Sequence, residues 1–192
     1  MGKSVCDEAN KISMNTIGEL LAANRDAIVK DWFHHILDTY PPETAKLWKK
    51  GGDPFHNPVA VRSHEAAAAV VDYLVKGHDE EALERVLAYL DELVRVRAVQ
   101  NFTPSQAAGF IFLLKKSVRE TLWNDLKRLG AWEEFVALES RIDGLALACL
   151  DLYAKCREKL YEIRLGDLRR EYTQLLKRAQ IVVGVNGEEP AR

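Results

Sequence analysis

The sequence lacks the features that identify most enzymes and membrane proteins. No window holds about 18 uncharged apolar residues, so we expect no transmembrane helix. The first residues, MGKSVCDEANKIS, have no apolar core of signal-peptide length. A phosphate-binding loop, a nucleophile motif and a metal signature are all missing, which predicts a protein that is not an enzyme and holds no metal or other cofactor. The only strand-like run, IVVGV at 181–185, is too short to form a sheet.

Cysteine is scarce, and neither sign of charge is in excess. The three cysteines, Cys6, Cys149 and Cys156, are an odd number without zinc-type spacing. This usage is typical of free thiols in a reducing compartment, and we expect a cytoplasmic protein. The formal net charge of −2 gives the whole chain no electrostatic footprint for nucleic acid. With 47% hydrophobic residues among 192, the chain can form one domain with a real core.

Helical periodicity is abundant. The clearest helix follows Thr103, a capping residue, and Pro104, which suits a first turn. Its apolar residues recur at steps of three and four on one face: Ala107, Ile111, Leu114, Val118, Leu122, Leu126 and Leu129. Similar patterns predict helices at about 16–40, 59–76 and 79–99, and a last helix from about 131, with a short amphipathic turn at 43–49. The fold class is therefore all-α, with five or six major helices.

The last helix is expected to be the longest. Its apolar residues alternate at steps of three and four over residues 135–163, a spacing typical of a coiled-coil seam. The seam predicts a homodimer, with four residues in or next to the interface: Leu145, Cys149, Leu152 and Cys156. The two cysteines are interpreted either as small apolar residues of the seam or as a redox-sensitive pair between subunits.

The chain also contains a basic segment. Residues 155–178 hold eight cations and four acids, a local charge of +4 on a slightly acidic chain. Together with the apolar stripe, this predicts a basic amphipathic helix suited to a partner groove or an anionic membrane surface. The candidate docking residues are Arg157, Arg164, Arg169, Arg170, Lys177 and Arg178. An ordinary solvated helix explains the same charges equally well.

The histidines do not form a recognisable metal motif. His34 and His35 are adjacent, so on a helix their side chains point about 100° apart and cannot both comfortably face one ion. His64 and Glu65 do not follow the spacing that places two imidazoles on one helical face. We therefore expect solvated or core-edge roles for these residues, and no metal.

The order of elements resembles a known family. VKDWFHHIL at 29–37, a proline break, NPVAVR at 57–62 and the run from LDELV to RETLW at 90–123 are similar to the N-terminal sensor domain of RsbRD-type proteins. These are RsbT co-antagonists of bacterial stress signalling. The resemblance covers about residues 14–155 and implies a haem-less, globin-like, dimeric domain that usually precedes a STAS domain. The βα alternation of a STAS domain is missing here, so we expect a stand-alone form with an altered partner.

The resemblance also bears on whether the chain has a residue that could bind haem iron. In haem-binding sensor globins a proximal histidine precedes an Ile-Gly-Leu-x-Pro-like turn, and matching that turn to residues 101–104 places Arg97 at the ligand position. A guanidinium is always protonated and has no lone pair for iron. We therefore expect no haem, and a small apolar ligand in the equivalent space.

Domain organisation and function follow from these observations. We expect a flexible segment at 1–12, a globin-like sensor domain at 13–163, a basic amphipathic helix at 164–183 and a disordered tail at 184–192. The predicted function is a dimeric, non-catalytic regulatory or sensor domain of bacterial stress or redox signalling, with a regulatory protein as partner. The alternative is an accessory docking protein that attaches through its basic helix to another complex or to a membrane surface.

Overall fold

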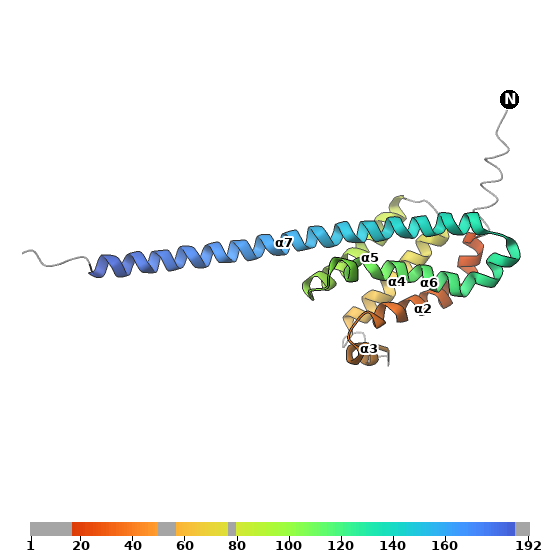
Figure 1. The fold of residues 1–192 in the computed structure, drawn as a ribbon, viewed down its shortest axis with the longest axis horizontal. Helices are drawn as coiled ribbons and strands as arrows, with labels where there is room; N and C mark the ends of the chain where they lie inside the picture. The colour runs from red at the N-terminus through yellow and green to blue at the C-terminus, as the bar shows by residue number, and fades with distance from the viewer. Residues whose placement is uncertain (1–16, 50–56, 77–79, 187–192) are drawn as a thin grey trace, which may run out of the picture. The chain divides into compact units, whose positions relative to one another are not determined.

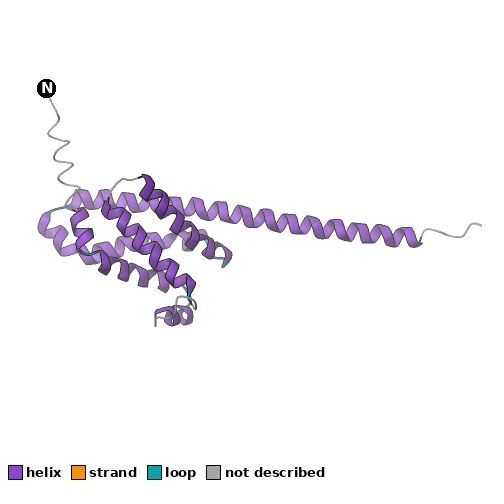
Figure 2. Cartoon of the chain, turned by 180° about the vertical axis from the view of Figure 1, so that it is seen from behind, coloured by secondary structure: helices purple, strands orange, loops and turns teal. Residues whose placement is uncertain are grey.

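The computed structural model describes residues 17–49, 57–76 and 80–186, and every regular element in these ranges is a helix (Figures 1 and 2). The helices are a first one over residues 17–23, α2 (Arg25–Asp38), α3 (Pro42–Lys49), α4 (Pro58–Lys76), α5 (Glu80–Val99), α6 (Pro104–Leu129) and α7 (Trp132–Asn186). The all-α prediction is confirmed, and so is the long last helix, since α7 has 55 residues. None of the helices in these ranges has the length and apolar content needed to cross a membrane.

Helix α6 begins and ends where the sequence indicates. The Thr103 hydroxyl accepts a hydrogen bond from the Gln106 backbone N–H at 3.3 Å, and the Gln106 side chain accepts one from the Thr103 N–H at 3.0 Å. This reciprocal capping satisfies backbone donors that a helix start leaves free. Gly130 then ends the helix at φ 67°, a left-handed conformation that glycine adopts without steric cost.

The first predicted helix, at about 16–40, is interrupted at Asn24. Its backbone turns to φ −110° and ψ 13°, and its side-chain amide donates to the Leu20 carbonyl at 2.9 Å. Asparagine side chains often bond to nearby backbone groups in this way, and so compete with regular helix formation. The apolar stripe continues across the break, which is why periodicity alone predicts one helix.

The packing places α2 against both α4 and α6, and α4 against α5 (Figures 1 and 2). Ala66 and Ala67 of α4 are buried, and their small side chains allow neighbouring helices to approach closely. Arg141 of α7 donates to the backbone carbonyls of Tyr73 and Leu74, both at 3.2 Å, near the end of α4. The largest fully buried apolar side chains include Trp32, Ile36, Leu90, Phe110, Ile111, Leu114 and Leu122.

The chain divides into two compact units, Met1–Tyr153 and Ala154–Arg192. Helix α7 belongs to both and continues without interruption through Gly166 and Asp167 to Asn186. It therefore includes residues 184–186, which the sequence assigns to a disordered tail. The predicted flexible segment at 1–12 and the rest of that tail, residues 187–192, lie outside the described residues.

Candidate functional site

Arg97 is a charged residue in the centre of the first unit. It lies near the end of α5 and is 0% exposed. One guanidinium nitrogen donates to the Gln106 carbonyl at 3.0 Å, and the other to the Thr39 hydroxyl at 2.9 Å. Its Nε–H is buried and has no hydrogen-bond partner among the described residues. Three helices, α2, α5 and α6, thus meet around a single side chain.

Aromatic rings surround the guanidinium. Its central carbon lies 4.5 Å from the ring centroid of Phe110, 4.9 Å from that of Tyr40 and 5.3 Å from that of Phe102. We call Arg97 and these three rings the arginine cage. Cations within about 6 Å of a ring face are attracted by the ring's electron-rich surface. Within the ranges that the structure describes, no carboxylate forms an ion pair with Arg97, so the rings and two neutral oxygens stabilise the charge.

Burial shifts the pKa values of the ionisable groups in this region. Desolvation lowers the pKa of Arg97 from its ordinary value. It raises the pKa of Tyr40, and it raises that of the Cys149 thiol to about 12, in each case against the pull of the Arg97 charge. At neutral pH the region therefore contains one cation, a neutral phenol and a neutral thiol.

The cage was only partly predictable. The resemblance singles out Arg97, and the residue also extends the buried face of α5, since Leu90, Leu93 and Val94 precede it by seven, four and three positions. A polar residue on such a face was a usable signal of a buried cation. Nothing in the sequence indicated that Tyr40 and Phe102 lie beside Arg97, because they belong to turns in distant parts of the chain. Tyr153 helps to fix one turn by donating to the Phe102 carbonyl at 2.6 Å.

The predicted interface residues differ in burial. Leu145 is 3% exposed and Cys149 is 0% exposed within the first unit, so the chain's own fold already covers them. Leu152 and Cys156 are half-buried. Their role in a dimer stays a prediction, and on this burial pattern the second pair is the one accessible to a partner.

The predicted docking cations lie along the second unit. Five are exposed, and Arg157, which donates to the Tyr161 hydroxyl at 3.0 Å, is half-exposed. Arg170 forms an ion pair with Asp167 at 3.3 Å. The exposed cations are Arg164, Arg169, Arg170, Lys177 and Arg178. Exposure of this kind is what docking requires, and a solvated helix shows it as well.

Cys149 is expected to be chemically silent in the folded chain. A thiol reacts as the thiolate, and a pKa of about 12 keeps Cys149 protonated at neutral pH. In a Cys6→Ser background, Ellman's reagent at about pH 8 should label Cys156 quickly and Cys149 only after unfolding in urea. Rapid labelling of both thiols without urea would contradict this expectation and favour the redox interpretation.

The fold and the cage define an all-α domain with a buried arginine enclosed by aromatic rings at its centre. The chain belongs to the family described as the RsbT co-antagonist protein rsbRD N-terminal domain, whose model matches residues 26–166. The matched range begins in α2 and ends within α7, so it includes every residue of the cage. The resemblance found in the sequence is thus confirmed, and the family is one of regulatory signalling domains. No curated protein and no solved structure matches the chain.

Proposed function

We propose that the chain is a regulatory domain of bacterial stress signalling that dimerises through the second half of α7. The proposal rests on membership of a co-antagonist family and on an exposed apolar surface in the second unit. A cytoplasmic location and a small apolar ligand as the signal are parts of the same proposal. The resemblance to haem-less sensor domains supports them, as does the buried arginine at the ligand position.

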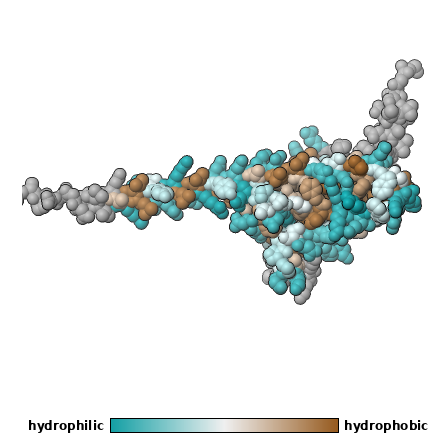
Figure 3. Space-filling model, in the orientation of Figure 1, coloured by the Kyte–Doolittle hydropathy of each residue, from teal (hydrophilic) through white to brown (hydrophobic). Residues whose placement is uncertain are grey.

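The exposed apolar surface is the observation that carries the dimer. Large apolar side chains at steps of four and three are each about half or more exposed: Tyr161, Leu165, Leu168, Tyr172 and Leu175. We call these five residues the α7 stripe, and hydrophobic residues are visible along this part of the helix in Figure 3. Alternating steps of four and three keep one face of a helix turned toward a partner helix. Exposed apolar patches of this kind mark association surfaces.

A charge in the α7 stripe is expected to dissociate the dimer. Leu168→Asp would place a carboxylate in an apolar interface, where an unpaired charge costs several kcal/mol. We expect light scattering at micromolar concentration to give a two-chain mass for the unmodified protein and a one-chain mass for the variant. Far-UV circular dichroism should still show a folded first unit, since Leu168 contributes nothing to its core.

The matched control is Gln174→Asp, which introduces the same side chain at an exposed position outside the α7 stripe. This variant should remain a dimer. A one-chain mass for the unmodified protein, or a dimer that persists in Leu168→Asp, would contradict the proposal.

The exposed cations favour a second candidate function, docking to another complex or to an anionic membrane surface. Attraction between surface charges is screened within about 8 Å at physiological ionic strength, so such binding should weaken steeply with salt. Deletion of residues 167–192 tests whether this segment is needed for binding or for the fold. Loss of salt-sensitive vesicle binding in a folded truncated chain would support docking, and unfolding would refute it.

A further inference from the structure

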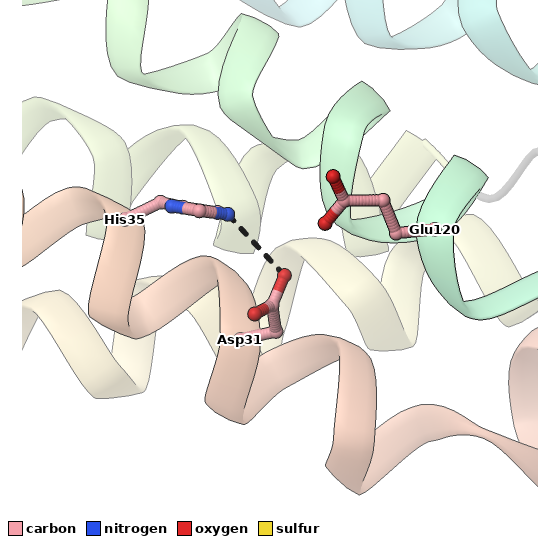
Figure 4. A group of neighbouring side chains, drawn as sticks. All are labelled: Asp31, His35 and Glu120. Carbon is pink, nitrogen blue, oxygen red and sulfur yellow. Dashed lines mark ion pairs between the residues drawn. The ribbon is translucent and has the colours of Figure 1, made fainter.

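Three side chains outside the arginine cage converge between α2 and α6. Asp31 and His35 lie one turn apart on α2, and Glu120 approaches them from α6 (Figure 4). One potential ligand atom from each residue lies within 4.8 Å of the other two. In the sequence, His35 stands out only through its neighbour His34, which is not part of this group. Its partners in the group are Asp31, four residues earlier on the same helix, and Glu120, on a helix far along the chain.

Two of these ligand atoms are buried without a hydrogen-bond partner. Asp31 Oδ2 and His35 Nε2 are both inaccessible to solvent, and neither forms a hydrogen bond with any described residue. They lie 3.4 Å apart as an ion pair across one helical turn, the contact drawn in Figure 4. Buried polar atoms are nearly always satisfied, and a neutral imidazole nitrogen facing a carboxylate oxygen is satisfied only when a cation lies between them, either a proton on the imidazole or a metal ion.

The spacing and chemistry of the group fit a divalent transition metal. A tetrahedral Zn²⁺ site with bonds of about 2.1 Å places its ligand atoms about 3.4 Å apart, the separation seen between Asp31 and His35. Two carboxylates balance the charge of a divalent cation. An imidazole in the set favours Zn²⁺ and its neighbours over Mg²⁺ or Ca²⁺, which prefer oxygen ligands alone.

The surroundings leave the site open on one side. Glu120 is 61% exposed, so its carboxylate can turn toward the ion and water can complete the coordination. Lys116 is the nearby cation, and its amine lies 3.9 Å from Glu120 in an exposed contact. Exposed ion pairs of this length contribute little, so Lys116 does not hold Glu120 away from an ion.

We propose that Asp31, His35 and Glu120 bind one Zn²⁺ ion, which joins α2 to α6. The inference goes beyond the proposed regulatory role and does not depend on it. Because the ion would bind the folded state and the unfolded chain has no assembled site, occupancy raises the stability of the first unit.

Zinc titration of the full chain tests the site. The protein is stripped with EDTA, exchanged into metal-free buffer and titrated with Zn²⁺ by calorimetry. We expect one ion per chain. His35→Ala and Glu120→Gln should each weaken binding by at least about tenfold, since even residues that only orient a metal ligand commonly contribute that much. His34→Ala is the matched control, because it removes the adjacent imidazole from the same helix, and its affinity should be unchanged.

Two further readouts separate this site from other zinc-binding groups. Zn²⁺ should raise the melting temperature of the unmodified chain and of His34→Ala, but not that of Glu120→Gln, whose exposed substitution leaves the fold intact. Co²⁺ in place of Zn²⁺ should give weak visible bands without a thiolate charge-transfer band. The inference is overturned if the unmodified chain binds no Zn²⁺, if Glu120→Gln binds as well as His34→Ala, or if the thiolate band appears.

Discussion

Arg97→Ala is expected to lower the free energy of unfolding by about 2–5 kcal/mol, the range found when large buried side chains are truncated. The substitution empties the arginine cage and leaves the rings of Tyr40, Phe102 and Phe110 facing a cavity. It also removes the donor to the Gln106 carbonyl and the Thr39 hydroxyl. Urea denaturation followed by far-UV circular dichroism measures the loss.

Arg97→Met separates packing from charge. Methionine fills most of the same volume and packs well against aromatic rings. It also removes a desolvated charge that has no carboxylate partner within the described ranges. Replacing a buried charge by an apolar residue of similar size is often neutral or stabilising, so we expect this variant to lie within about 1 kcal/mol of the parent or above it. Equal losses for the two variants would show that the charge itself stabilises the fold.

Trp32→Ala is expected to cost about 3–5 kcal/mol, as for other buried tryptophans. Trp32 is 0% exposed, stacks on Phe110 with centroids 6.3 Å apart, and donates its indole N–H to the Phe110 carbonyl at 2.9 Å. Truncation therefore removes apolar contacts and a hydrogen bond between α2 and α6 together. The same urea titration provides the measurement.

The control is Trp123→Ala, which deletes the same side chain from a position that is 42% exposed. Trp123 contacts Trp132 edge-on, with centroids 5.5 Å apart. An exposed aromatic pair contributes about 1 kcal/mol, so the loss should not exceed that amount by much. Similar losses for Trp32→Ala and Trp123→Ala would contradict the burial on which this prediction depends.

Local signals were enough to predict most of the helices but not the sites. The Thr103 cap and the apolar stripe of α6 act within one segment, so the sequence predicts that helix closely. The break at Asn24 depends on a side chain that competes for the Leu20 carbonyl, and periodicity does not register such competition. The long last helix was predicted, but the change of apolar phase at Gly166 and Asp167 was interpreted as a break between a sensor domain ending at residue 163 and a separate basic helix. Helix α7 passes through these residues, because a change of apolar phase does not require a helix to end.

The sites depend on contacts between distant segments. Arg97 was identified through a family pattern, while the rings around it come from turns that only the folded chain brings together. Glu120 lies on a different helix from Asp31 and His35, and no spacing rule links such positions. Sequence patterns therefore indicate which faces are buried more reliably than which polar groups meet between them.

The boundary at Tyr153 has a consequence for how association and folding are coupled. Up to Tyr153, helix α7 is held by burial and by the bond to the Phe102 carbonyl. Beyond it, the described side chains are exposed or half-exposed, and an isolated helical segment in water is only marginally stable. A partner that covers the α7 stripe would thus supply the free energy that keeps this segment helical, and its affinity would include the cost of ordering the backbone. Gly166 lowers the helix propensity of this segment, and a side chain added there would meet no other atom within 4 Å. A substitution at Gly166 would therefore change the affinity for the partner through the cost of helix formation alone.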